Sequence, residues 1–138
     1  DPSNADDRFD RARLRQALRS QTTLDVEAAA RSARWLAEAD DAIDWAVDRL
    51  IASWPDASDI AVIRDAGYPP EVFRRVVTQR LRANDSQLAL RGASLDGVIA
   101  AMKEGRRAMV GALLIDAVPG LGGTIWRISA APRRKTGK

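Results

Sequence analysis

Two sets of charged residues are spaced so that they could bind a partner. The first set, an acidic ridge that recurs every four residues on one face of a predicted helix, consists of Asp40, Asp44 and Asp48. The second set lies in a later segment with a helical apolar pattern and consists of Arg74, Arg75 and Arg80. Carboxylates at this spacing repel one another by about 0.2–0.5 kcal/mol per pair, so the ridge needs counter-charges. The arginines could supply them within the chain, which is the simpler interpretation, or a basic partner could. The six residues together form the predicted partner-binding surface.

The segment 60–82 also fits a helix-turn-helix pattern: a short predicted helix, Gly67 in the turn, and a second helix bearing arginines. In such motifs the second helix enters the major groove of DNA. This alternative assigns DNA contacts to Arg74, Arg75, Arg80 and Arg82. Ile63 counts against it, because it stands where the close packing of the two helices usually needs alanine. Any αα-hairpin with a glycine turn gives the same pattern, so DNA binding is our second interpretation.

Few residue types that commonly carry catalysis are present. The chain has no His and no Cys, which excludes Cys–His and Ser–His–Asp triads, thiol redox chemistry and Cys/His zinc sites. One acidic helix face cannot surround a hard metal ion, which needs carboxylates from several elements. The glycine-rich run at 120–124 lacks the Gly-Lys-Ser/Thr ending of a phosphate loop. We therefore predict no enzyme activity, no cofactor and no metal site, although folding could still bring an acid–base pair of carboxylates together.

Length and composition predict one helical domain. The chain has 138 residues, of which 46% are apolar and 30% charged, a mixture typical of a globular protein. It contains 25 Ala, the best helix former, and 19 of its 22 basic residues are Arg, a composition that suggests a bacterial, GC-rich genome. No signal peptide is visible and the chain starts without Met, so we expect a cytoplasmic domain of a larger protein. We expect the domain to span 1–131, followed by a basic flexible tail or linker at 132–138.

The apolar patterns predict an all-α fold, a compact bundle of four to six helices. Two of them are long, at 24–54 and 94–118, and a short αα-hairpin at 58–83 packs across them. The first long helix has no Gly or Pro, and Leu36, Ile43 and Leu50 recur every seven residues in it. The sequence leaves open whether this helix breaks near Asp40 and Asp41. Shorter helices are expected at 6–20 and 86–90, and 124–128 is either an extended segment or a last helical turn.

Three further features each have two interpretations. The apolar stretch 108–126 just reaches the length of a membrane span, but Asp116 and the break at Pro119 make membrane association the least favoured function. The tryptophans Trp35, Trp45 and Trp54 are nine or ten residues apart and cannot share one helix face, so they are either spread through the core or partly exposed for binding. A row of small residues every four positions indicates that another helix approaches closely, within the bundle or from another chain; the row is Ala93, Gly97, Ala101 and Gly105.

Charge is distributed unevenly along the chain. The net charge of +3 is the sum of +1 over residues 1–19, −6 over 20–63 and +8 over 64–138. We therefore predict a non-catalytic, arginine-rich helical domain for protein–protein interaction, an adaptor within a larger bacterial protein, with nucleic acid as the alternative partner. The sequence leaves the identity of the partner, the parent protein and the oligomeric state open.

Overall fold

The computed structural model describes residue 16 and residues 25–120 and 123–132. The chain divides into two compact units, Asp1–Asp41 and Ala42–Lys138, and each is described by itself. The predicted helix at 6–20, apart from Gln16, and the tail residues 133–138 lie outside the described residues. The predicted division into 1–131 and a tail stays a prediction.

Helix α2, Val26–Ala52, is one continuous helix. Asp25 caps its start, because the backbone N–H of Ala28 donates to Asp25 Oδ1 at 3.0 Å. The helix ends shortly before Trp54, which precedes a proline and is therefore disfavoured in the α conformation. The predicted long helix at 24–54 is confirmed, and the alternative break near Asp40 and Asp41 is wrong.

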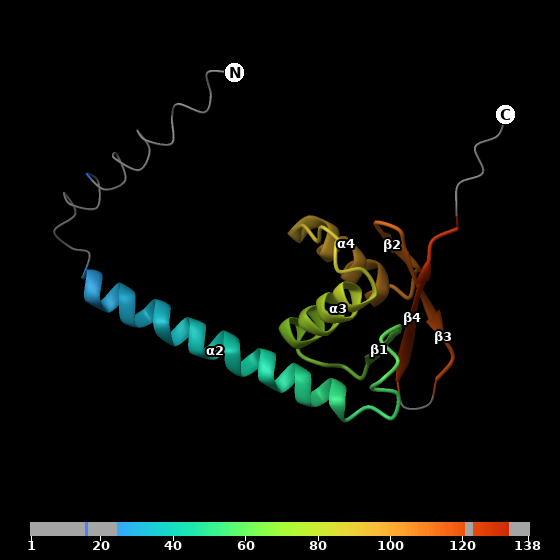
Figure 1. Ribbon diagram of the computed structural model, residues 1–138, viewed down its shortest axis with the longest axis horizontal. Helices are drawn as coiled ribbons and strands as arrows, with labels where there is room; N and C mark the ends of the chain where they lie inside the picture. The colour runs from blue at the N-terminus through green and yellow to red at the C-terminus, as the bar shows by residue number, and fades with distance from the viewer. Residues whose placement is uncertain (1–15, 17–24, 121–122, 133–138) are drawn as a thin grey trace, which may run out of the picture. The chain divides into compact units, whose positions relative to one another are not determined.

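A four-stranded antiparallel sheet organises the second unit (Figure 1). Its strands are β1 (Val62–Asp65), β2 (Ala108–Val110), β3 (Leu113–Val118) and β4 (Thr124–Ala130). The spatial order is β1-β4-β3-β2, so the first strand pairs with the last. The register places Ile63 opposite Trp126 and Ile115 opposite Ile128, and all four side chains are buried.

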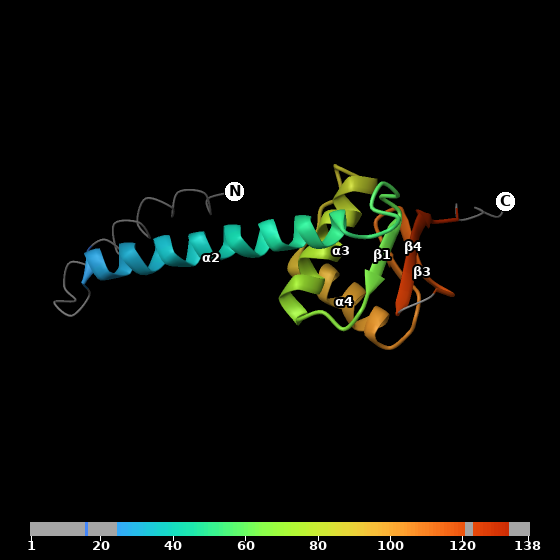
Figure 2. The ribbon, with the colours of Figure 1, turned by 90° about the horizontal axis from the view of Figure 1, so that it is seen from below.

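Helices α3 (Pro70–Asn84) and α4 (Gly92–Lys103) lie on one side of this sheet (Figure 2). The core forms where their apolar stripes meet the sheet. From α3 it takes Phe73, Val76, Val77 and Leu81. From α4 it takes Leu95, Val98, Ile99 and Met102. The second helix expected in the hairpin at 58–83 is confirmed by α3.

The predicted all-α fold is wrong. The first helix expected in the hairpin at 58–83 is replaced by β1, so this segment is a strand followed by a helix and not an αα-hairpin. The expected helix at 94–118 ends at Lys103 and continues as β2 and β3. Residues 86–90 are not helical, whereas 124–128 is extended as one alternative predicted.

Gly105 is the physical reason why α4 stops. Its φ is +68°, a left-handed conformation that favours glycine. The N–H of Gly105 donates to the carbonyl of Met102, and the N–H of Arg106 to that of Ala101, both at 2.9 Å. These two bonds are the Schellman pattern that ends helices. After it, β2 alternates between buried and exposed residues, as a strand with one covered face does.

The apolar stretch 108–126 is divided among β2, β3 and the start of β4. Among the residues that the structure describes, no helix is both long and apolar enough to cross a membrane.

Candidate functional site

A groove of about 530 Å³ in the second unit brings together most of the predicted binding residues. Its walls come from the C-terminal part of α2, from α3, and from Leu95 at the start of α4. The charged residues that line it are Asp44, Asp48, Glu71, Arg74, Arg75 and Arg82. Asp40 belongs to the first unit and is not part of this groove.

Arg75 is held inside the groove by two carboxylates. Its Nη1 lies 2.6 Å from Asp44 Oδ1 and its Nε lies 3.0 Å from Glu71 Oε1. Only 17% of its side chain is exposed. Next to it, Gln79 Nε2 donates to Asp48 Oδ1 at 2.7 Å. Two residues of the acidic ridge are thus bound by α3 of the same chain, and Arg75 joins α2 to α3.

Arg74 and Arg82 have a different environment. Arg74 Nη1 lies 2.6 Å from Asp96 Oδ1 on α4, and 40% of the Arg74 side chain is exposed. Arg82 is exposed at the groove wall. Between them on the same face of α3 lies Thr78, whose hydroxyl donates to the carbonyl of Arg74 at 2.8 Å. These three residues recur every four positions, and Arg74 and Arg82 give the groove its accessible donors.

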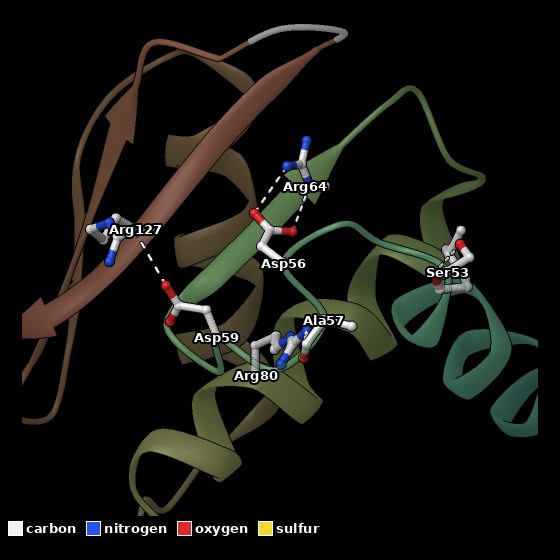
Figure 3. Close-up of polar contacts among 8 residues, drawn as sticks. Ser53, Asp56, Ala57, Asp59, Arg64, Arg80 and Arg127 are labelled. Atoms are coloured by element: carbon white, nitrogen blue, oxygen red, sulfur yellow. Dashed lines mark hydrogen bonds and ion pairs between the residues drawn. The ribbon is translucent and has the colours of Figure 1, made fainter.

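Arg80 is not a surface residue. It is only 4% exposed, and its Nη2 donates to the carbonyl of Ala57 at 3.1 Å (Figure 3). Its guanidinium lies 5.3 Å from the centre of the Trp54 ring. Burial lowers the pKa of Arg80 from its ordinary value, although an arginine keeps its charge in a protein. Helical spacing could have indicated that Arg80 is buried, because it follows Val76 by four residues and Val77 by three and so lies on the apolar face of α3.

The loop 53–61 presents two aspartates to the sheet, which the sequence analysis did not single out (Figure 3). Arg64 donates from Nε and Nη2 to the two carboxylate oxygens of Asp56, both at 2.9 Å. These hydrogen bonds hold the pKa of Asp56 below its usual value. Arg127 Nη2 lies 3.4 Å from Asp59 Oδ2. No spacing in the sequence reveals these pairs, because they join a loop to strands β1 and β4.

Within residues 25–120 and 123–132, no three Asp or Glu side chains are grouped so that they could hold a metal ion together. The small residues at 93, 97 and 101 line a second groove, of about 400 Å³, between α4 and β2. A Cβ added to Gly97 would meet no atom within 4 Å, so no helix of the described residues packs closely against this position.

Two curated proteins are similar to almost the whole chain. The tRNA(Ile)-lysidine synthase of Zymomonas mobilis is 29% identical over 136 residues, which are 98% of this chain and 40% of the relative. The tRNA(Ile)-lysidine synthase of Novosphingobium aromaticivorans is 34% identical over 140 residues, again 40% of the relative and 99% of this chain. The chain therefore spans about 40% of the length of these relatives. No protein-family model and no solved structure gives a significant match.

These relatives overturn the functional predictions. The predicted non-catalytic adaptor and the predicted lack of enzyme activity are wrong, since both relatives are named as synthases. The absence of His and Cys excludes particular mechanisms and does not exclude that a chain is part of a larger enzyme. The helix-turn-helix alternative is wrong as well, because its first helix is replaced by β1.

Proposed function

We propose that this chain is part of an enzyme that modifies tRNA, of the tRNA(Ile)-lysidine synthase kind, and that it contributes to tRNA binding. The observation that carries the proposal is the similarity to two such synthases over 98% and 99% of the chain. The match covers 40% of each relative, so the complete enzyme would contain further parts. Within this chain, the groove of the second unit is the candidate site of contact with RNA.

Arg74, Thr78 and Arg82 support this assignment. In an α-helix four residues rise by about 6 Å, so the three side chains form a row along α3 that can follow a sugar–phosphate backbone. Guanidinium groups bind phosphates with two parallel hydrogen bonds. The single hydroxyl proton of Thr78 is already donated to the carbonyl of Arg74, so the two arginines supply the donors of this row. The row lies in the basic part of the chain, since residues 64–138 have a net charge of +8.

The carboxylates near Arg74, Asp96 at 2.6 Å and Glu71 at 3.6 Å, do not prevent this binding. Asp96 is 59% exposed and Arg74 is 40% exposed in their ion pair. An ion pair with such exposure contributes about 0–1 kcal/mol, so a phosphate can replace the carboxylate at small cost. Arg75 differs, because only 17% of its side chain is exposed and both of its ion pairs are short, 2.6 Å to Asp44 and 3.0 Å to Glu71. We therefore assign the phosphate contacts to Arg74 and Arg82 and a positioning role to Arg75.

Binding of a tRNA(Ile) transcript to the chain, measured over a series of salt concentrations, tests the proposal. The logarithm of the affinity should fall linearly with the logarithm of the salt concentration. Arg74→Ala and Arg82→Ala should each weaken binding and reduce that slope by about 1. Arg49→Ala is the matched control, because Arg49 is an exposed arginine of the same unit that does not line the groove.

Two results would contradict the proposal. One is the absence of tRNA binding at a salt concentration of about 50 mM, where phosphate contacts are strong. The other is a pair of variants, Arg74→Ala and Arg82→Ala, that bind with the affinity and salt dependence of the unaltered chain. A comparison with a transcript of another tRNA shows in addition whether this chain contributes to the choice of tRNA.

A further inference from the structure

The part of α2 that belongs to the first unit has one polar side and one apolar side. Successive residues of an α-helix are 100° apart, so the charged residues of 26–41 gather mainly on one side, where Arg31 lies 3.9 Å from Glu27. The opposite side, which we call the open face of α2, carries Val26, Ala29, Ala33 and Leu36, with Asp40 at its C-terminal end. Trp35 lies about 100° from Leu36, at the border with the polar side. Val26 and Leu36 are each 71% exposed.

The open face continues a stripe that is buried elsewhere on the same helix. Leu36, Ile43 and Leu50 recur every seven residues. In the second unit the side chains of this stripe are covered: Val47 and Ile51 are buried, and Ile43 and Leu50 pack against the core. A helix with a sustained apolar stripe is stabilised mainly by burying that stripe. Within the described residues of the first unit, nothing covers the stripe between positions 26 and 36, where large apolar side chains are exposed.

We propose that the open face of α2 is the docking surface for another part of the same synthase polypeptide, a part that this chain does not contain. The inference rests on the proposed function. More than half of the length of each relative has no counterpart in this chain, so such a part exists in proteins of this kind. Exposed large apolar side chains on one helix face, here Val26 and Leu36, are typical of a protein–protein contact.

Charge argues against RNA at this face. Residues 25–41 contain five acidic residues and two arginines, which gives this stretch a net charge of −3. The acidic residues are Asp25, Glu27, Glu38, Asp40 and Asp41. They repel a phosphate backbone, so the surface that docks here has an apolar centre and a basic rim.

Thiol labelling tests the inference cleanly, because the chain has no cysteine of its own. Leu36→Cys and Arg34→Cys place single thiols on opposite sides of α2, two residues apart. Their alkylation rates are compared in the 138-residue chain and in the complete synthase. We expect both thiols to react at similar rates in the chain alone. In the complete synthase, Leu36→Cys should react at least about tenfold more slowly than Arg34→Cys, because only local opening exposes a covered side chain.

Ala33→Cys is the second variant on the open face, and it adds only one sulfur atom, so it guards against loss of docking by the Leu36 substitution itself. Equal rates for both faces in the complete synthase would overturn the inference. Slow labelling of the open face in the 138-residue chain alone would also overturn it. Protection that does not depend on protein concentration would assign the face to residues 1–24, and protection that increases with protein concentration would assign it to a second copy of the chain. Protection that needs added tRNA would assign it to RNA. The main labelling experiment is done without tRNA. A failure of the chain to bind tRNA would therefore overturn the proposed function without changing the labelling result.

Discussion

Arg80 shows how one side chain of α3 fixes the loop that precedes the sheet. It is the only charged residue that is buried among those the structure describes. Arg80 donates a hydrogen bond to the carbonyl of Ala57 in this loop. One turn further along α3, Asn84 Nδ2 donates to the carbonyl of Ile60 in the same loop at 2.8 Å. The same loop carries Asp56 and Asp59, which bind arginines of β1 and β4. The loop is therefore fastened to the helix by its carbonyls and to the sheet by its carboxylates.

Arg80→Ala should destabilise the chain by about 2–4 kcal/mol, since it removes the hydrogen bond to Ala57, the contact with the Trp54 ring and the packing of the aliphatic stem. The measurement is the free energy of unfolding in urea, followed by circular dichroism. Arg82→Ala, two residues further on an exposed side of the same helix, is the control and should stay within about 0.5 kcal/mol of the unaltered chain. Equal losses for the two variants would show that Arg80 has no special structural role.

At the scale of elements, the length of a periodic pattern decided what the sequence could predict. α2 and α3 have apolar residues at helical spacing over 27 and 15 residues, enough to exclude a strand. β1 and β2 have four and three residues, too few to show a period, and β1 pairs with β4, whose residues lie some 60 positions further along the chain. The groove was predictable in part for the same reason. The attraction between the ridge on α2 and Arg75 on α3 follows from two recognisable helices, whereas the contact of Arg74 with Asp96 depends on how α4 packs.

Gly97, inside α4, and Gly105, two residues after its last residue, test where this helix ends. Gly105→Ala should destabilise the chain by about 1 kcal/mol, because its φ of +68° is unfavourable for a residue with a Cβ. Gly97→Ala lies inside the helix, meets no atom within 4 Å, and should stabilise it by about 0.5–1 kcal/mol. Thermal unfolding of both variants gives the comparison. A helix continuing to residue 118 would instead gain stability from both substitutions, so stabilisation by Gly105→Ala would contradict the end of α4 at Lys103.

For the whole molecule, charge pairing within the fold changes what the net charge means. Many arginines of the second unit are bound to carboxylates, among them Arg75 to Asp44 and Arg107 to Asp116. Residues 42–132 contain eleven basic and ten acidic residues, so this stretch is nearly neutral. The last six residues contain four basic residues and no acidic one. The parts of the chain that could attract RNA are therefore the accessible arginines on α3, within a stretch of almost zero net charge, and the strongly basic last six residues of the sequence.

Removal of residues 133–138 should weaken tRNA binding more than any single substitution in the groove. It takes away Arg133, Arg134, Lys135 and Lys138 and changes the net charge from +3 to −1. Each phosphate contact contributes about 0.7–0.9 to the salt slope, so the loss of four contacts reduces that slope by about 3. Two controls separate charge from sequence: the same six residues in a different order should keep the binding, and glutamine at the four basic positions should reproduce the truncation. If the truncated chain kept the full slope, the contacts would lie entirely in the folded unit, and Arg74 and Arg82 would have to account for them.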